Sequence, residues 1–221
     1  MKLDLLRRGL ADNLAAEGIL QSEDVRRAFL KVPREAFVWP GSLGQAYFDM
    51  PLSLGETGQT ISAPHMVVIM LEALKPKPGD VVLEVGTGSG YNAALLAEMV
   101  CPDGRSGGRV VTVERVPELA DFARSNLAKT GYSDRVQVIV GDGTLGDGAG
   151  TKFDGIMVTA AAPRIPAALK RQLKPNGRLL IPVGHLGYQD LIRCTRKAGD
   201  RYEEENLGGC IFVPLVGQDG Y

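Results

Sequence analysis

The segment VVLEVGTGSGY, residues 81–91, decides the fold class of this chain. An apolar run over residues 81–85 leads into Gly86, Gly88 and Gly90, and a helical pattern starts at Tyr91. Glycines let a backbone turn sharply and pass close under a ligand, and the start of a helix offers free amide donors. A buried strand, a glycine turn and a helix in this order are typical of a ligand site at the carboxyl edge of a parallel sheet.

Short apolar runs alternate with helical patterns around and beyond this segment. The expected strands are residues 81–85, 110–113, 136–140, 156–159 and 179–182, and the expected helices between them are 91–100, 117–129 and 165–173. This alternation predicts an α/β fold with a Rossmann-like, doubly wound, mostly parallel sheet. Two further strands, 191–195 and 210–216, predict a C-terminal antiparallel hairpin, with the acidic run 203–205 in a solvated turn.

The N-terminal third of the chain has a different pattern. We expect helices over residues 3–16, 23–32 and 64–74, with Ser22 as an N-cap, and a glycine- and proline-rich loop with short extended pieces from residue 40 to 61. These patterns predict a single domain over residues 1–221. Residues 1–76 form its helical cap on the substrate side, and residues 77–221 form its α/β core.

The composition is that of an ordinary soluble protein. Hydrophobic residues make up 44% and charged residues 23%, which excludes a mostly disordered chain, and the net charge of -1 predicts no nucleic-acid or membrane partner. Cys101, Cys194 and Cys210 form no CxxC pair, so we expect reduced thiols, no metal site and a cytoplasmic location. We also expect a monomer, since no exposed apolar stripe is evident.

Acidic residues follow three successive strands. Glu84 precedes Gly86, Glu114 ends the second strand, and Asp142 lies between two glycines after the third. Glu84 can hold a ligand's ammonium group, Glu114 both hydroxyls of a ribose and Asp142 an adenine amino group. Each acid alone is equally well explained as an exposed strand-end carboxylate, but together with the glycine turn they predict a site for S-adenosyl-L-methionine. The predicted cofactor-binding residues are Glu84, Gly86, Thr87, Gly88, Ser89, Gly90, Glu114, Asp142, Gly143 and Thr159.

A dinucleotide-binding dehydrogenase is one alternative to this prediction. The dinucleotide fingerprint needs a small residue three places after its second glycine, where this chain has Tyr91, and Glu84 would repel a pyrophosphate. A second alternative is a binding module that keeps the pocket and has lost turnover. Nothing in the motif favours it.

The sequence resembles the protein-L-isoaspartate (D-aspartate) O-methyltransferases, a branch of the class I S-adenosylmethionine-dependent methyltransferases, over nearly its whole length. The resemblance is carried by VPREAFV (32–38), GQTISAPHM (58–66), EVGTGSGYNAA (84–94), GDG (141–143), FDGIMVTAAA (153–162), PVG (182–184) and FVPL (212–215). A methyltransferase acting on a small molecule would not need GQTISAPHM or FVPL, and it stays as a third alternative.

This resemblance implies methyl transfer from S-adenosyl-L-methionine to the free α-carboxylate of L-isoaspartyl residues in damaged proteins and peptides. The product of the cofactor is S-adenosyl-L-homocysteine, and the ester then closes to a succinimide without the enzyme. Because a carboxylate with a pKa of ~4 is already ionised at neutral pH, this reaction needs no general base.

The resemblance also implies which residues form the substrate side. Ser62 matches the active-site serine, and the substrate-binding residues are Thr60, Ile61, His65, Val213, Pro214 and Leu215. From the residues alone, Ser62 is also interpreted as a helix N-cap, and His65 as a locally hydrogen-bonded side chain. One departure is an apparent extra residue between Leu54 and Gly58, which predicts an altered loop over the substrate.

Overall fold

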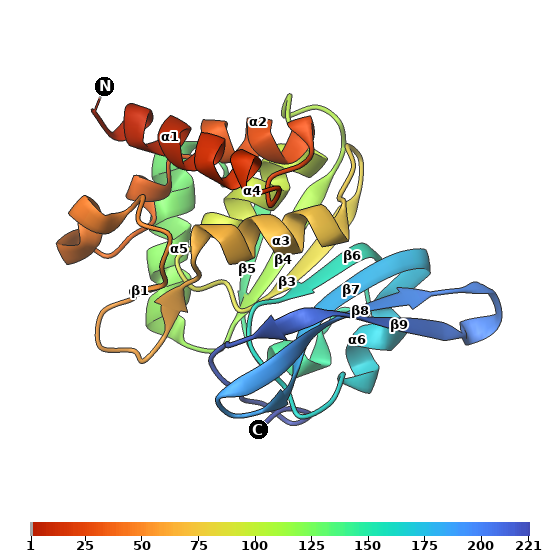
Figure 1. The fold of residues 1–221 in the computed structure, drawn as a ribbon. Coiled ribbons are helices and arrows are strands. Elements are labelled where there is room, and N and C mark those ends of the chain that lie inside the picture. The colour runs from red at the N-terminus through yellow and green to blue at the C-terminus, as the bar shows by residue number, and fades with distance from the viewer. Residues whose placement is uncertain (1) are drawn as a thin grey trace.

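A seven-stranded sheet of order β5-β4-β3-β6-β7-β8-β9 forms the centre of the computed structural model, which describes residues 2–221 (Figure 1). Strands β3 to β7 run parallel, and β8 and β9 are added antiparallel to β7. The predicted mostly parallel sheet with a C-terminal antiparallel hairpin is therefore confirmed. The strands are β3 (Val81–Val85), β4 (Arg109–Glu114), β5 (Val136–Val140), β6 (Phe153–Val158), β7 (Leu173–His185), β8 (Tyr188–Arg196) and β9 (Tyr202–Cys210).

Helices cover both faces of this sheet, and alternate residues of each strand pack on opposite faces. Val82 and Val110 join the hydrophobic cluster of the N-terminal helices and α4, whereas Leu83 and Val111 join the cluster that includes Leu169 of α6. This alternation follows from the two-residue period of a β-strand buried on both sides. The helices are α1 (Lys2–Ala16), α2 (Glu23–Lys31), α3 (Pro64–Leu74), α4 (Tyr91–Val100), α5 (Pro117–Thr130) and α6 (Ala167–Gln172).

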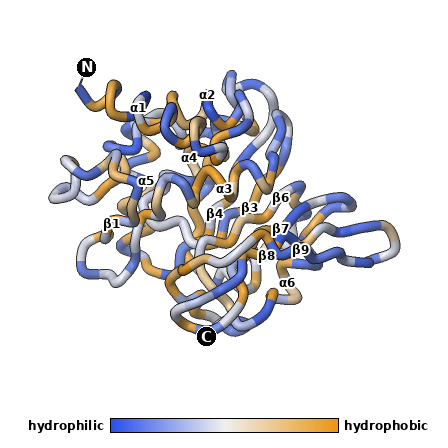
Figure 2. The backbone as a smooth tube through the Cα atoms, viewed as in Figure 1, coloured by the Kyte–Doolittle hydropathy of each residue, from blue (hydrophilic) through white to orange (hydrophobic). Residues whose placement is uncertain are grey.

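The N-terminal helices begin within one residue of the predicted positions. Ser22 caps α2, since its hydroxyl accepts a hydrogen bond of 3.4 Å from the Val25 amide. The loop between α2 and α3 contains two 3₁₀ turns, η1 (Arg34–Ala36) and η2 (Pro40–Gln45), and a short antiparallel pair, β1 (Leu52–Ser53) and β2 (Thr60–Ile61). Figure 2 shows α3 as a hydrophobic segment close to the strands. β2 lies at the carboxyl edge of the sheet, since a Cβ on Gly88 in the turn after β3 would be 3.9 Å from the Thr60 carbonyl oxygen.

The predicted position of the second strand of the C-terminal hairpin, residues 210–216, is wrong. The strand lies at residues 202–210 and contains the acidic run. Glu203, Glu204 and Glu205 are all exposed and pair with Lys197, Lys170 and Arg193, so this edge strand tolerates three consecutive acids. The segment after β9 instead crosses the carboxyl edge of the sheet, where Pro214 forms an isolated bridge with Ala161.

Three further properties concern residues 2–221 as a whole. None of their helices is both long and apolar enough to cross a membrane. They contain no group of three or more His, Cys, Asp and Glu side chains arranged to hold a metal ion. Cys101, Cys194 and Cys210 are buried free thiols.

Candidate active site

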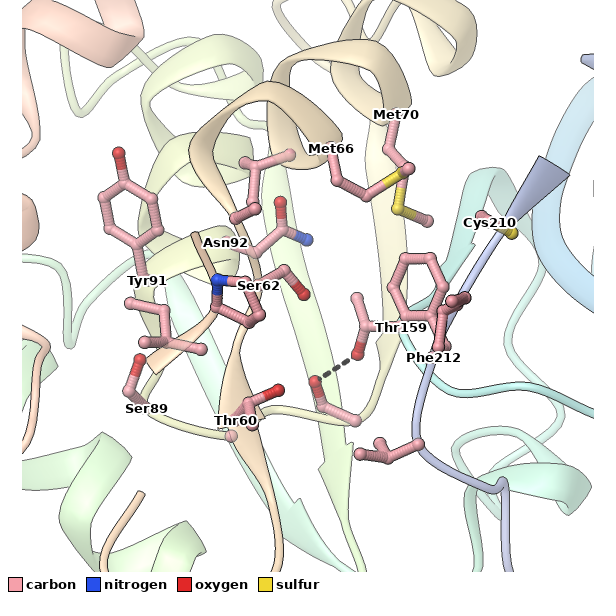
Figure 3. A pocket seen from close by; sticks show the side chains of 18 of the residues that line it. Thr60, Ser62, Met66, Met70, Ser89, Tyr91, Asn92, Thr159, Cys210 and Phe212 are labelled. Carbon is pink, nitrogen blue, oxygen red and sulfur yellow. Dashed lines mark hydrogen bonds between the residues drawn. The ribbon is translucent and has the colours of Figure 1, made fainter. Parts of the chain in front are cut away.

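A cavity of about 630 Å³ lies between α3, the turn after β3 and the segment after β9 (Figure 3). A smaller hollow of about 70 Å³ adjoins it on the side of β4 and shares Thr60, Gly86, Gly88, Thr159 and Val213 with it. The two together bring most of the predicted site residues to one place. The predicted residues that line the larger cavity are Thr60, Ile61, Ser62, His65, Glu84, Gly86, Thr87, Gly88, Ser89, Thr159 and Val213.

The glycine turn after β3 adopts the backbone that its sequence predicts. Gly86 and Gly90 have φ angles of 94° and 87°, a region that favours glycine. A Cβ on Gly86 would collide with the Thr159 hydroxyl, which donates a hydrogen bond of 2.7 Å to the Gly86 carbonyl (dashed in Figure 3). A Cβ on Gly90 would instead lie 3.3 Å from Ala123 of α5. Gly90 therefore packs the turn against a helix and lines neither cavity.

Glu84 is fully buried at the floor of the larger cavity. Its carboxylate accepts hydrogen bonds from Asn92 Nδ2 at 2.8 Å and from Thr112 Oγ1 at 2.6 Å. Burial raises the pKa of Glu84 to about 7, although these two donors act in the opposite direction, and the charge of Glu114 raises it further. No cationic side chain among residues 2–221 pairs with this buried carboxylate, so it favours a positively charged ligand group.

Asn92 is a site residue that the sequence analysis missed. Its Oδ1 atom is buried and has no hydrogen-bond partner among residues 2–221, and its side chain points into the cavity (Figure 3). A ligand donor at this point would satisfy Oδ1 while facing Glu84. The signal available in the sequence was its place in the first turn of the helix that follows the glycines.

Glu114 lines the smaller hollow at the end of β4. Oε2 accepts a hydrogen bond of 2.9 Å from the Gly88 amide, and Oε1 accepts one of 3.0 Å from the Val116 amide. Each carboxylate oxygen has two lone pairs, so both oxygens can accept a further hydrogen bond. The arrangement suits a pair of neighbouring hydroxyls.

Asp142 is not brought into either cavity. Its carboxylate accepts hydrogen bonds from the Thr144 amide at 2.9 Å, the Thr144 hydroxyl at 2.6 Å and the Gln218 amide at 2.8 Å. It therefore caps the turn η3 (Gly143–Leu145) and anchors the C-terminal tail. Gly143 does line the smaller hollow, and a Cβ there would collide with Val85. Contact of Asp142 with an adenine group stays a prediction.

Ser62 lies between β2 and the start of α3, and its side chain points into the cavity (Figure 3). The N-cap of α3 is Ala63, which has no side-chain cap, so the interpretation of Ser62 as an N-cap is wrong. Its hydroxyl makes no hydrogen bond within the described chain, whereas its carbonyl accepts one of 2.9 Å from Arg34 Nη2. The hydroxyl is thus free to bind a ligand.

His65 both lies at the cavity and is hydrogen-bonded locally, the two roles that the sequence left open. It lines the cavity, and its Nδ1 lies 2.9 Å from Asp49 Oδ1, which also accepts a hydrogen bond of 2.9 Å from the His65 amide. Asp49 therefore sets the orientation of the ring. The ring is half-buried at the cavity.

The segment after β9 forms the wall opposite Ser62. Val213 lines both cavities, and Pro214 and Leu215 line the smaller one. The Val213 carbonyl and the Leu215 amide are already paired with Ala161, at 2.8 and 2.7 Å. These bonds fix the segment in place and restrict the main-chain groups that it can offer to a peptide.

An apolar end of the larger cavity was also missed by the sequence analysis. Met66 and Met70 of α3 face Cys210 and Phe212 across it (Figure 3). Burial raises the pKa of the Cys210 thiol to about 11, so the thiol is neutral and adds to the apolar surface. In the sequence these residues were indistinguishable from ordinary core residues.

Comparisons with known proteins agree with this geometry. The model of the family "Protein-L-isoaspartate(D-aspartate) O-methyltransferase (PCMT)" matches residues 6–220. Protein-L-isoaspartate O-methyltransferases of Methanopyrus kandleri and Staphylothermus marinus are 52% and 51% identical, over 97% of this chain and 93% and 96% of theirs. A Plasmodium falciparum structure described as a protein-L-isoaspartate O-methyltransferase with S-adenosyl-L-homocysteine has a TM-score of 0.84 and 29% identity, covering 95% of this chain and 98% of its own.

Proposed function

Because this chain belongs to the protein-L-isoaspartate (D-aspartate) O-methyltransferase family, we propose that the cavity between α3 and the glycine turn is the active site for the family's reaction. The enzyme uses S-adenosyl-L-methionine to methylate the free α-carboxylate of L-isoaspartyl residues in damaged proteins and peptides. The resulting ester initiates repair through a succinimide.

The residues around Glu84 fit S-adenosyl-L-methionine. The buried carboxylate of Glu84 and the unpartnered Oδ1 of Asn92 would hold the ammonium group of the cofactor. Gly86 and Gly88 have no side chains, so the cofactor can lie close to the main chain of the turn. Glu114 would bind its ribose hydroxyls. Thr87, Ser89, Gly143 and Thr159 shape the walls. Asp142 lines neither cavity, and it is assigned to the adenine end because it precedes Gly143, which lines the smaller one.

When bound, S-adenosyl-L-methionine supplies a methyl group carried on a sulfonium cation. The chain's contribution is to bring an ionised carboxylate into line with that group and to exclude water. The unengaged Ser62 hydroxyl would donate a hydrogen bond to one carboxylate oxygen and so fix the direction of the other. The apolar side chains of Met66, Met70 and Phe212 lower the local dielectric and strengthen the attraction between the two charges.

Recognition of the damaged peptide is assigned to residues on both sides of Ser62. Thr60, Ile61 and His65 come from β2 and α3, and Val213, Pro214 and Leu215 from the opposite wall. In this arrangement residues 1–76 act as the substrate-side cap of residues 77–221. These residues would contact mainly the main chain of the peptide, so that substrates of different sequence can bind.

We further propose that the enzyme works as a monomer in the cytoplasm, with no nucleic-acid or membrane partner. The near balance of 25 basic and 26 acidic residues supports the absence of a nucleic-acid or membrane partner. Size-exclusion chromatography with light scattering tests the monomer. A dimer at micromolar concentration would contradict it.

The single observation that carries the site assignment is the free Ser62 hydroxyl in a cavity that also contains Glu84 and Asn92. The experiment uses labelled S-adenosyl-L-methionine and two peptides that differ only in one isoaspartyl or aspartyl linkage. Base-labile methyl ester on the isoaspartyl peptide alone is the expected result. Equal label on both peptides would contradict the proposed recognition by residues 60–65 and 213–215.

A further inference from the structure

Arg34, in the turn η1, is a completely buried arginine behind the wall of the cavity. Its Nε donates a hydrogen bond of 2.9 Å to the Ala46 carbonyl, and its Nη2 donates one of 2.9 Å to the Ser62 carbonyl. The guanidinium carbon lies 5.1 Å from the centre of the Tyr91 ring. Its third nitrogen, Nη1, is buried and has no partner among residues 2–221.

The charge of Arg34 is not neutralised by a direct ion pair within the described chain. The groups that interact with its charge are the Tyr91 and Tyr47 phenols and, more weakly, Asp49, which is already hydrogen-bonded to His65. Burial lowers the pKa of Arg34, but a guanidinium keeps its proton in proteins. A buried cation without a counterion is costly, and an arriving anion would relieve that cost.

Arg34 lies directly behind the point assigned to the methyl acceptor. Ser62 and Tyr91 both line the cavity, and Arg34 contacts both of them without lining it itself. Its positive charge therefore acts through one layer of protein, where electrostatic interactions are stronger than in water. The hydrogen bond to the Ser62 carbonyl also fixes the main chain that carries the Ser62 hydroxyl.

We propose that Arg34 is a positioning residue for the methyl acceptor, because it holds the Ser62 main chain and its unpaired charge favours an anionic over a neutral group in the cavity. The inference rests on the proposed site, with the acceptor carboxylate next to Ser62. In the sequence, Arg34 stands out only as part of VPREAFV, and no role was predicted for it.

The test compares two peptides that are identical except that the α-carboxylate of the isoaspartyl residue is replaced by a carboxamide. Their dissociation constants are measured by calorimetry with the enzyme saturated with S-adenosyl-L-homocysteine. Wild-type enzyme should bind the acid more tightly than the amide. In Arg34→Met this preference should fall by roughly tenfold, while affinity for S-adenosyl-L-homocysteine itself changes little.

Two variants separate charge from structure. Arg34→Lys keeps the charge but cannot donate to both the Ala46 and the Ser62 carbonyls in the same geometry. It should therefore retain the preference for the acid and have a lower kcat. Arg135→Met is the matched control, because Arg135 also stacks on a tyrosine, Tyr132 at 4.4 Å, and donates to two carbonyls, yet lines neither cavity. It should lower stability and leave the preference unchanged.

An Arg34→Met enzyme that is folded and keeps the full preference for the acid would overturn the proposal. If Arg34→Met does not fold, the pKa of a ¹³C-labelled α-carboxylate is measured in the wild-type complex instead. A bound pKa below that of the free peptide supports the proposal, and a higher one overturns it. Methylation by the wild type is measured separately, so failure of the site assignment is distinguishable from failure of the role of Arg34.

Discussion

Glu84 and Thr112 are paired across β3 and β4, and the Thr112 hydroxyl donates a hydrogen bond of 2.6 Å to the Glu84 carboxylate. The same hydroxyl lies 2.7 Å from the Thr87 hydroxyl, and Asn92 holds the other carboxylate oxygen. The carboxylate is thus oriented by donors from two elements, β4 and α4. These hydrogen bonds fix the position of the Glu84 carboxylate, whereas its charge depends on pH.

Cofactor binding should therefore depend on pH near neutrality. The pKa of Glu84 is raised to about 7 in the free protein, by burial and by the nearby charge of Glu114, and an ammonium ligand needs the ionised form. Affinity for S-adenosyl-L-homocysteine should fall below pH 7, approaching about tenfold per pH unit. Calorimetry between pH 6 and 8 checks this. In Glu84→Gln the affinity should be weaker at pH 8 and nearly independent of pH, and a flat wild-type profile would contradict the assignment.

The same pKa predicts how stability changes with pH. The pKa of Glu84 is raised from 4.5 in the unfolded chain to about 7, so between these values the folded state binds more protons than the unfolded state. The free energy of unfolding should then decrease as pH rises from about 4.5 to 7 through this group. Glu84→Gln should be more stable than wild type at pH 8 by about 1–3 kcal/mol, and equal at pH 4.5. Urea unfolding of the ligand-free proteins measures both, and a less stable variant at pH 8 would show that hydrogen bonds outweigh desolvation.

Glu114 should determine cofactor affinity with little direct effect on the acceptor. Removing a charged hydrogen-bond acceptor costs about 1.5–3 kcal/mol, so Glu114→Ala should weaken S-adenosyl-L-homocysteine binding by about 10- to 100-fold. Glu118→Ala removes an exposed acid from the first turn of α5 and is the matched control. Similar affinity in both variants would remove Glu114 from the cofactor site.

Local patterns were sufficient to predict the bounds of several helices and strands. Residues 81–85, 91–100 and 136–140 begin and end as expected, because glycine, proline and apolar periodicity mark their ends. The strand β9 could not be predicted in this way, since its exposed acids depend on lysines and an arginine that approach only in the folded sheet.

The site could be predicted where chemistry is visible in residue type, and not where it depends on burial. Glu84 and Glu114 follow from their places at strand ends, and Ser62 follows from the family resemblance of GQTISAPHM; all three lie at the cavities. Arg34 and Asn92 become informative only through a buried atom without a partner, which no sequence pattern records. Asp142 is the opposite case: it stands in a recognisable motif, but its carboxylate accepts a hydrogen bond from the Gln218 amide of the C-terminal tail.

Asp142 should contribute to stability whether or not it binds the cofactor. Its carboxylate caps η3 and holds the Gln218 amide, so Asp142→Ala should lower the free energy of unfolding by about 1–2 kcal/mol. Thermal unfolding with and without S-adenosyl-L-homocysteine separates the two roles. If the ligand raises the melting temperature of Asp142→Ala as much as that of wild type, Asp142 has only the structural role.

Ser62→Ala should lower turnover without affecting folding or cofactor binding. The hydroxyl has no hydrogen-bond partner within residues 2–221, so its loss leaves no buried group unsatisfied, and stability should change by less than about 0.5 kcal/mol. Loss of one hydrogen bond to the reacting carboxylate should reduce kcat by about 10- to 100-fold for an isoaspartyl peptide. Ser53→Ala is the control, because Ser53 of β1 pairs with Thr60 of β2 and lines neither cavity. Equal kcat for both variants and the wild type would show that Ser62 does not orient the acceptor.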